Sequence, residues 1–145
     1  MTSTTGRKTI DELLATARSR LARVRPAEAR AALAGEALLV DIRSESQRAA
    51  DGVVPGAVWF PRNVLEWRCD PASDARDERI GGLERHLIIM CDEGYQSSLA
   101  AATLQELGFA RATDLVGGFR AWRAAGLPVA PKSPPGAAKE AACSA

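Results

Sequence analysis

The sequence predicts an α/β fold with a mostly parallel sheet of four to five short strands and helices on both faces. Short apolar runs, of which 87–90 is the clearest, have the length of buried strands. Segments with helical spacing separate these runs, and turns containing glycine or proline end most of them. Strands that alternate with helices indicate crossover connections, which join parallel strands.

The composition limits the class of protein. A chain of 145 residues with a net charge of +1 has the size of one domain and no global charge that would attract nucleic acid or an anionic membrane. The three cysteines, Cys69, Cys91 and Cys143, lack the spacing of a metal site or a disulfide framework. No run approaches the roughly 20 apolar residues that span a bilayer, and the N-terminus lacks the apolar core of a signal peptide. We therefore expect a cytoplasmic protein that binds neither nucleic acid nor membrane.

The first half of the chain begins with a helix, because Thr9 and Glu12 form a capping-box pattern and apolar residues then repeat at helical spacing. Pro26 begins a second helix and Gly35 ends it. The expected order up to residue 68 is the first helix, a very short strand at Val24, a helix over 26–34, a strand over 37–42, a short helix over 44–51, a turn over 52–57, a strand over 57–61, and a helix over 64–68 capped by Asn63.

The second half contains the longest apolar strand. A charged segment over 70–82 predicts an exposed loop or irregular helix. The strand ending at residue 91, a helix closed by Gly108, a strand over 112–116 and a helix over 119–125 then follow. From residue 131 the composition predicts a disordered tail. The expected organisation is an N-terminal helical extension over 1–23, a domain over 24–130 and a tail over 131–145.

Cys91 lies where the longest apolar strand meets the next helix. At the carboxyl end of a parallel strand, loop amides and a helix N-terminus converge and favour an anion. The same groups stabilise a thiolate, which is the nucleophilic form of cysteine. We therefore predict Cys91 as a nucleophile at the head of an anion-binding loop. The loop residues are Asp92, Glu93, Gly94, Tyr95, Gln96, Ser97 and Ser98.

Three separated patches together resemble the rhodanese (sulfurtransferase) domain: residues 40–43 with 52–57, residues 91–97, and residues 115–122 with 126–129. The resemblance covers about residues 24–130 and implies the three-layer rhodanese fold. It implies that Cys91 takes a sulfane sulfur from a donor, holds it as a persulfide bound by the loop, and passes it to a thiol, cyanide or protein acceptor. It implies no metal or organic cofactor, and a small sulfur donor or a persulfidated protein as partner. Asp41 and Arg43 are expected to support the loop by pairing or capping.

Loop length separates sulfur transfer from phosphoryl transfer. Phosphatases and arsenate reductases of the related fold have a loop one residue longer and carry Arg six residues after the cysteine, to bind phosphate oxygens. This chain has Ser97 there, and no Arg occurs over 92–99. Two alternatives stay open: a non-catalytic module that senses sulfur species or binds a protein with the same loop, and, with less support, an arsenate reductase or phosphatase.

The loop also departs from the family pattern. Gln96 replaces an Arg common in members that use thiosulfate, and Val53 replaces the usual His of the earlier turn. Asp92 and Glu93 would repel an anionic donor, so we predict weak thiosulfate:cyanide activity and a preference for a less anionic donor or a protein persulfide.

Several residues have more ordinary roles. Ser97 and Ser98 are expected to be helix caps. His86 is expected at a strand entry, Tyr95 at the lip of the site, and Cys69 as a bystander rather than a resolving thiol. The oligomeric state and the choice between a flap and a dimer contact for the N-terminal helix stay open.

Overall fold

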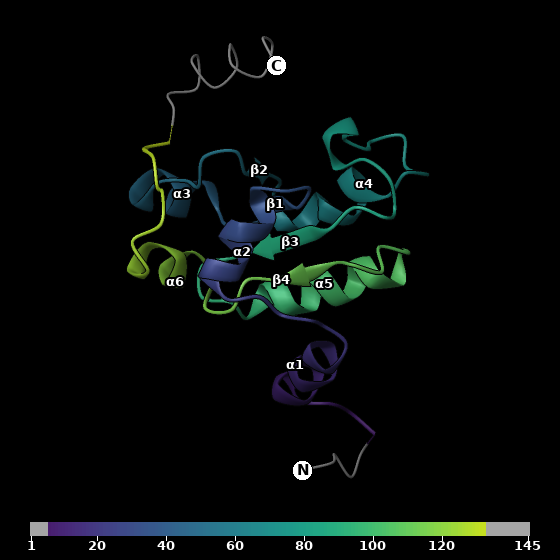
Figure 1. Cartoon of the computed structure of the whole chain (residues 1–145). Helices are drawn as coiled ribbons and strands as arrows, with labels where there is room; N and C mark the ends of the chain where they lie inside the picture. Colours follow the sequence, from purple (N-terminus) through teal and green to yellow (C-terminus); the bar gives the residue numbers. More distant parts are fainter. Residues whose placement is uncertain (1–5, 133–145) are drawn as a thin grey trace.

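A computed structural model describes residues 6–132. Its centre is a four-stranded parallel sheet of order β2-β1-β3-β4 (Figure 1). The strands are β1 (Leu38–Asp41), β2 (Val58–Trp59), β3 (Leu87–Met90) and β4 (Thr113–Asp114). Val24 adds a single parallel bridge to Leu115 beside β4. The predicted parallel sheet is therefore confirmed, and the very short strand expected at Val24 is a single bridge at its edge.

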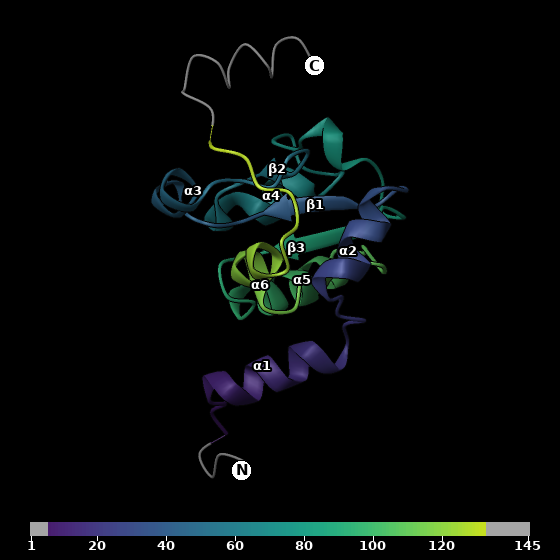
Figure 2. The ribbon, with the colours of Figure 1, turned by 60° about the vertical axis from the view of Figure 1, so that its left-hand side comes forward.

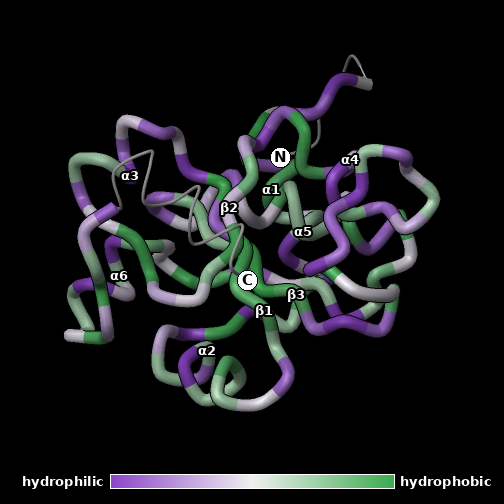
Figure 3. Tube along the Cα trace, turned by 90° about the horizontal axis from the view of Figure 1, so that it is seen from above, coloured by the Kyte–Doolittle hydropathy of each residue, from purple (hydrophilic) through white to green (hydrophobic). Residues whose placement is uncertain are grey.

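Helices cover both faces of this sheet (Figures 1 and 2). Leu65 and Leu104 pack on one face and Ala29 and Phe119 on the other. The helices are α1 (Ile10–Ser19), α2 (Pro26–Leu33), α3 (Glu45–Asp51), α4 (Leu65–Cys69), α5 (Gln96–Glu106) and α6 (Gly118–Ala124). All four residues of β3 are buried, and Figure 3 shows β1 and β3 as an apolar centre surrounded by largely polar loops. The α/β class follows from these layers.

The N-terminal helix α1 lies outside α5, on the side away from the sheet (Figure 2). Its predicted capping box is present: Glu12 N donates to Thr9 Oγ1 and Thr9 N donates to Glu12 Oε1, both at 3.1 Å. Ala17 is buried against the domain, whereas Ile10 and Leu13 are exposed. The extension therefore forms an added layer on α5 within one protomer.

One local prediction is wrong, and two segments make contacts that the sequence did not predict. Asn63 does not cap a helix, because a 3₁₀ turn (Arg62–Val64) precedes α4 and Val64 stands at its N-cap. The charged segment over 70–82 contains a second 3₁₀ turn (Glu78–Ile80), whose Ile80 is buried and anchors it. Val53 forms an antiparallel bridge with Ala130, so the end of the domain lies beside the segment that follows α3. Of the predicted tail, residues 133–145 lie outside the described residues.

Candidate active site

Cys91 follows β3 directly at the carboxyl edge of the sheet. Its side chain is buried, and its Sγ accepts hydrogen bonds from the backbone amides of Gly94 at 3.1 Å and Ser97 at 3.4 Å. Backbone amides directed at one atom form a site for a negatively charged group. The loop is therefore arranged to hold an anionic sulfur on Cys91.

Glycines permit the loop to lie against the start of α6. Gly94 has φ +88°, and a Cβ there would lie 2.7 Å from Gly117 N. A Cβ on Gly118 would lie 2.5 Å from the carbonyl oxygen of Cys91. Phe119 N donates to that same oxygen at 2.9 Å. The Gly117-Gly118 pair thus fixes the backbone from which the Cys91 side chain projects.

A cavity of about 650 Å³ opens in front of Cys91. Its walls are the β1–α3 connection, the segment after β2, and the loop itself. Trp59 and Arg62 line it together with Tyr95 and Gln96, which are exposed at the loop. This volume is typical of small-molecule sites. A small molecule can therefore reach the Cys91 sulfur.

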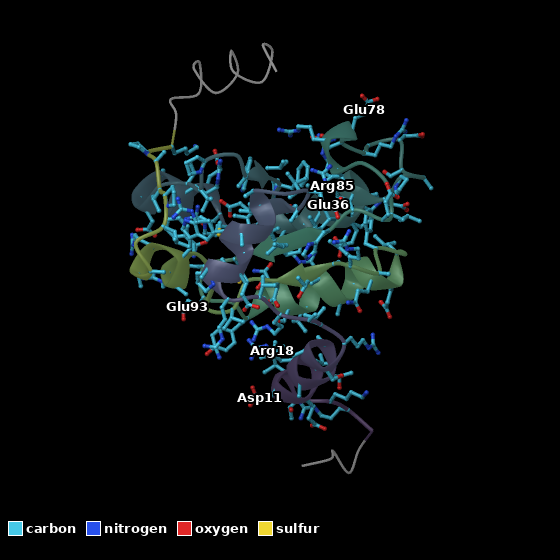
Figure 4. All side chains as sticks on the ribbon, in the orientation of Figure 1. Asp11, Arg18, Glu36, Glu78, Arg85 and Glu93 are labelled. Carbon is cyan, nitrogen blue, oxygen red and sulfur yellow. The ribbon has the colours of Figure 1, made fainter. Side chains whose placement is uncertain are left out.

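The two loop carboxylates have different surroundings. Asp92 Oδ2 accepts a hydrogen bond from Arg120 Nε of α6 at 2.7 Å. This contact with Asp92 raises the pKa of the Arg120 guanidinium above its ordinary value. Glu93 is exposed, and Figure 4 shows its side chain at the surface. The predicted repulsion of anionic donors therefore depends mainly on Glu93, because Arg120 balances the charge of Asp92.

A buried carboxylate that sequence reasoning missed lies behind the loop. Asp114, the last residue of β4, is fully buried. Its Oδ2 accepts from Ser97 Oγ at 2.7 Å and from Ser98 Oγ at 2.8 Å, and its Oδ1 accepts from Arg23 Nε at 2.8 Å. The expectation that the two serines are helix caps is wrong, because both hydroxyls donate to Asp114. An Asp within the predicted strand over 112–116 was the available signal.

The N-terminal extension reaches the same place. Arg18 Nη2 of α1 and Arg23 Nη2 donate to the carbonyl oxygen of Gly94 at 2.7 and 3.0 Å. Arg18 Nε also donates to Ser98 Oγ at 3.1 Å. In Figure 4, Arg18 lies between α1 and the rest of the domain. Both arginines were absent from the predicted site.

Asp41 and Arg43 form the predicted pair. Both are buried, and Arg43 donates to Asp41 through Nε at 3.1 Å and Nη2 at 2.9 Å. Arg43 Nη2 also donates to Gly52 O at 2.8 Å, and the guanidinium lies 3.8 Å from the centre of the Phe119 ring. Their side-chain hydrogen bonds thus hold the wall of the cavity and do not reach the Cys91 loop.

The remaining candidates lie away from the chemistry. Cys69 is buried, and burial with the nearby Glu66 and Asp77 charges raises its pKa to about 12, which is unfavourable for a resolving thiol. Burial lowers the pKa of His86, which does not line the cavity. Cys143 lies outside the described residues. Within residues 6–132, no helix could cross a bilayer and no cluster of His, Cys, Asp and Glu could hold a metal.

Fold and site together define an α/β domain with a cysteine-headed anion loop. The rhodanese-like domain family matches residues 25–125. The chain is 35% identical over 94 residues to a sulfurtransferase of Allochromatium vinosum, covering 65% of this chain and 78% of that protein. It is 32% identical over 95 residues to the thiosulfate:glutathione sulfurtransferase of Homo sapiens, covering 61% and 80%.

Among solved structures, the chain is similar to a protein of unknown function from Rhodopseudomonas palustris, described as a possible tyrosine phosphatase. The TM-score is 0.79 and the identity 32%, over 90% of this chain and 98% of that one. The family match covers more than half of this chain, and the sulfurtransferase relatives are matched over most of their length. The protein belongs to the rhodanese-like domain family, as the three sequence patches predicted.

Proposed function

We propose that the protein is a sulfurtransferase that carries sulfane sulfur on Cys91. The observation that supports this most directly is the Cys91 thiol at the carboxyl end of β3, with the Gly94 and Ser97 amides donating to its Sγ and a cavity in front of it. The sulfurtransferase names of the relatives agree with this assignment. Asp92, Glu93, Tyr95 and Gln96 would form the lip that donors and acceptors cross.

The reaction needs only the thiolate and two substrates. The Cys91 thiolate attacks the sulfane sulfur of a donor, its S–S bond forms as the donor's bond breaks, and the leaving group, sulfite in the case of thiosulfate, takes the bonding electron pair. The enzyme then holds a persulfide anion on Cys91. An acceptor thiolate attacks the outer sulfur, forms a new S–S bond and releases the Cys91 thiolate with its electron pair. With cyanide as acceptor the product is thiocyanate.

The charges at the cavity bear on the choice of donor. Glu93 is exposed at the loop and Glu45 lines the same cavity. Both oppose the approach of a dianion such as thiosulfate, although Lys132 and Arg48 pair with Glu45. We therefore expect thiosulfate to be a poor donor compared with a less anionic persulfide. The human relative's name supports glutathione-sized thiols as a class of acceptor.

A second candidate is phosphate-ester hydrolysis, which the likeness to the possible tyrosine phosphatase favours. Such chemistry needs a cation in the loop to bind the oxygens of phosphate. The loop over 92–98 has none, and Arg18 and Arg23 contact the Gly94 carbonyl without lining the cavity. Sulfur transfer therefore has the stronger support, and a persulfide anion fits a site made of backbone amides.

Intact-mass spectrometry after exposure to thiosulfate, mercaptopyruvate or a persulfidated thiol tests the proposal. We expect the parent to gain one sulfur that a reductant removes, and Cys91→Ser to gain none. Cys69→Ser is the matched control, because that buried thiol should not contribute. Steady-state assays should give a higher KM for thiosulfate than for the persulfidated thiol. No gain of sulfur with any donor would overturn the proposal, and turnover of a phosphate ester would favour the alternative.

A further inference from the structure

We propose that the N-terminal extension supplies two positioning residues, Arg18 and Arg23, which hold the Gly94–Tyr95 peptide so that the Tyr95 amide faces the sulfur carried by Cys91. The inference rests on the proposed sulfur transfer and names residues that act on that site from outside it. Both arginines precede residue 25, where the match to the family begins. They therefore belong to a part of the chain that the family assignment does not cover.

The Gly94 carbonyl is the point of contact. Two guanidinium groups donate to this single oxygen, Arg18 Nη2 at 2.7 Å and Arg23 Nη2 at 3.0 Å. Hydrogen bonds from charged donors are stronger than neutral ones. The described residues contain no cis peptide, and in a planar trans peptide the C=O and the following N–H point in opposite directions. The Tyr95 N–H is consequently directed away from both arginines.

The loop bounds the cavity, but the two arginines do not. Tyr95 lines it, whereas no residue of α1 and no part of Arg23 does. Among the residues that the structure describes, the Tyr95 amide has no hydrogen-bond acceptor. The amides of Gly94 and Ser97 already donate to Cys91 Sγ. The Tyr95 amide is therefore a donor left for the outer sulfur of a persulfide or for an incoming anion.

Each arginine is itself held in place. Arg23 pairs with the buried Asp114, which also accepts from the hydroxyls of Ser97 and Ser98. Arg18 donates to Ser98 Oγ, and its guanidinium lies 5.4 Å from the centre of the Tyr95 ring. The loop is thus fixed from behind at Gly94, Ser97 and Ser98. Positioning of this kind keeps amide donors directed at a reacting anion without reorganisation.

The extension also supplies charge that the loop lacks. No cationic side chain occurs over 92–98, and Glu93 adds an exposed negative charge. Within residues 6–132, Arg18 forms no ion pair with a carboxylate, so its positive charge stays uncompensated next to the start of α5. A positive charge there adds to the helix dipole in favouring a sulfur anion.

Single-turnover loading of Cys91, followed by mass spectrometry, tests the inference with Arg18→Gln and Arg23→Gln. We expect loading to slow roughly 10- to 100-fold in each, less than the roughly 100- to 1000-fold seen when a donor to a reacting anion is itself removed, because the arginines only position the donor. Arg18→Lys, which keeps the charge and one donor, should recover part of the loss. Arg20→Gln is the matched control, since Arg20 lies in the same segment but, among the described residues, its side chain pairs only with the exposed Glu106.

Two further measurements separate positioning from folding and from the proposed function. Thermal unfolding gives the folded fraction of each variant, and the alkylation rate of Cys91 by iodoacetamide reports thiolate reactivity without a sulfur donor. We expect slower alkylation in Arg18→Gln at an unchanged folded fraction. Loading of Cys91 at the parent rate in both glutamine variants would overturn the inference. So would a loss of loading rate that is explained by the folded fraction alone and is as large in Arg18→Lys as in Arg18→Gln. If the parent takes up no sulfur but its Cys91 is still alkylated faster than that of Arg18→Gln, the proposed sulfur transfer is overturned and the positioning role of Arg18 is kept.

Discussion

Two buried aspartates end the strands on either side of β3, the strand that Cys91 follows, and they contact different parts of the molecule. Asp41 ends β1 and binds Arg43, two residues further along the chain. Asp114 ends β4 and binds Arg23, which lies 91 residues earlier. The Asp41 pair is local and holds the cavity wall together with Gly52. The Asp114 pair is long-range and connects the N-terminal extension to the Cys91 loop. An Asp–Arg pair thus stabilises the fold in one place and positions the candidate site in the other.

Removing the buried arginine of the local pair should have the largest effect. Arg43→Met leaves Asp41 buried, with Arg48 at 3.5 Å as its remaining cationic partner. We expect the free energy of unfolding to fall by about 3–5 kcal/mol, because an uncompensated buried charge is costly. Urea denaturation measures it. Adding Asp41→Asn should restore part of the loss, and a fall below about 1 kcal/mol would show that Arg48 or water replaces Arg43.

Neutralising each aspartate should separate the two roles. Asp114→Asn keeps one acceptor oxygen for the serines but weakens the hold on Arg23, so we expect a stability loss of about 1–3 kcal/mol together with slower sulfur loading of Cys91. Asp41→Asn should cost a similar amount of stability but load sulfur at the parent rate per folded molecule. Loading kinetics corrected for the folded fraction measure the difference. Equal loading rates in the two variants would contradict the distinction.

This contrast also explains which parts of the molecule were predictable. The parallel sheet, the position of Cys91 and the Asp41–Arg43 pair follow from patterns within a few residues, because strand length, turn chemistry and an i, i+2 pair are local. The contacts of Asp114 with Arg23, and of Arg18 with Gly94, join segments more than 70 residues apart. No periodicity indicates such partners. They depend on α1 packing against α5, which is a property of the assembled fold.

Asn63 and Ile80 illustrate the same limit on a smaller scale. Asn63 has the chemistry of a cap, yet the 3₁₀ turn over Arg62–Val64 shifts the helix start past it. Ile80 lies in a charged segment that predicts an exposed loop, but its side chain reaches the core beneath the sheet. For Ile80, burial in the core overrides a local preference. Predictions from residue type therefore held best where burial on the sheet and local preference agreed.

The smallest expected effect belongs to an exposed copy of the local pair. Asp77 and Arg79 have the same spacing as Asp41 and Arg43, and the same three donors of the arginine contact the carboxylate, including Arg79 Nη2 at 2.7 Å. Arg79 is 59% exposed, whereas the Arg43 side chain is fully buried. Because solvent screens the charges, Asp77→Asn should cost at most about 1 kcal/mol at neutral pH.

The pH dependence of that variant sharpens the comparison. The Arg79 hydrogen bond holds the pKa of Asp77 below its ordinary value, so the pair stabilises the fold above the unfolded-state pKa of about 4. That contribution is lost as the pH falls through the lower folded-state pKa. The stability difference between the parent and Asp77→Asn should therefore shrink below about pH 4, as measured by thermal unfolding across pH. A stability loss in Asp77→Asn as large as that in Arg43→Met, or one that grows in acid, would show that burial does not distinguish the Asp77–Arg79 pair from the Asp41–Arg43 pair.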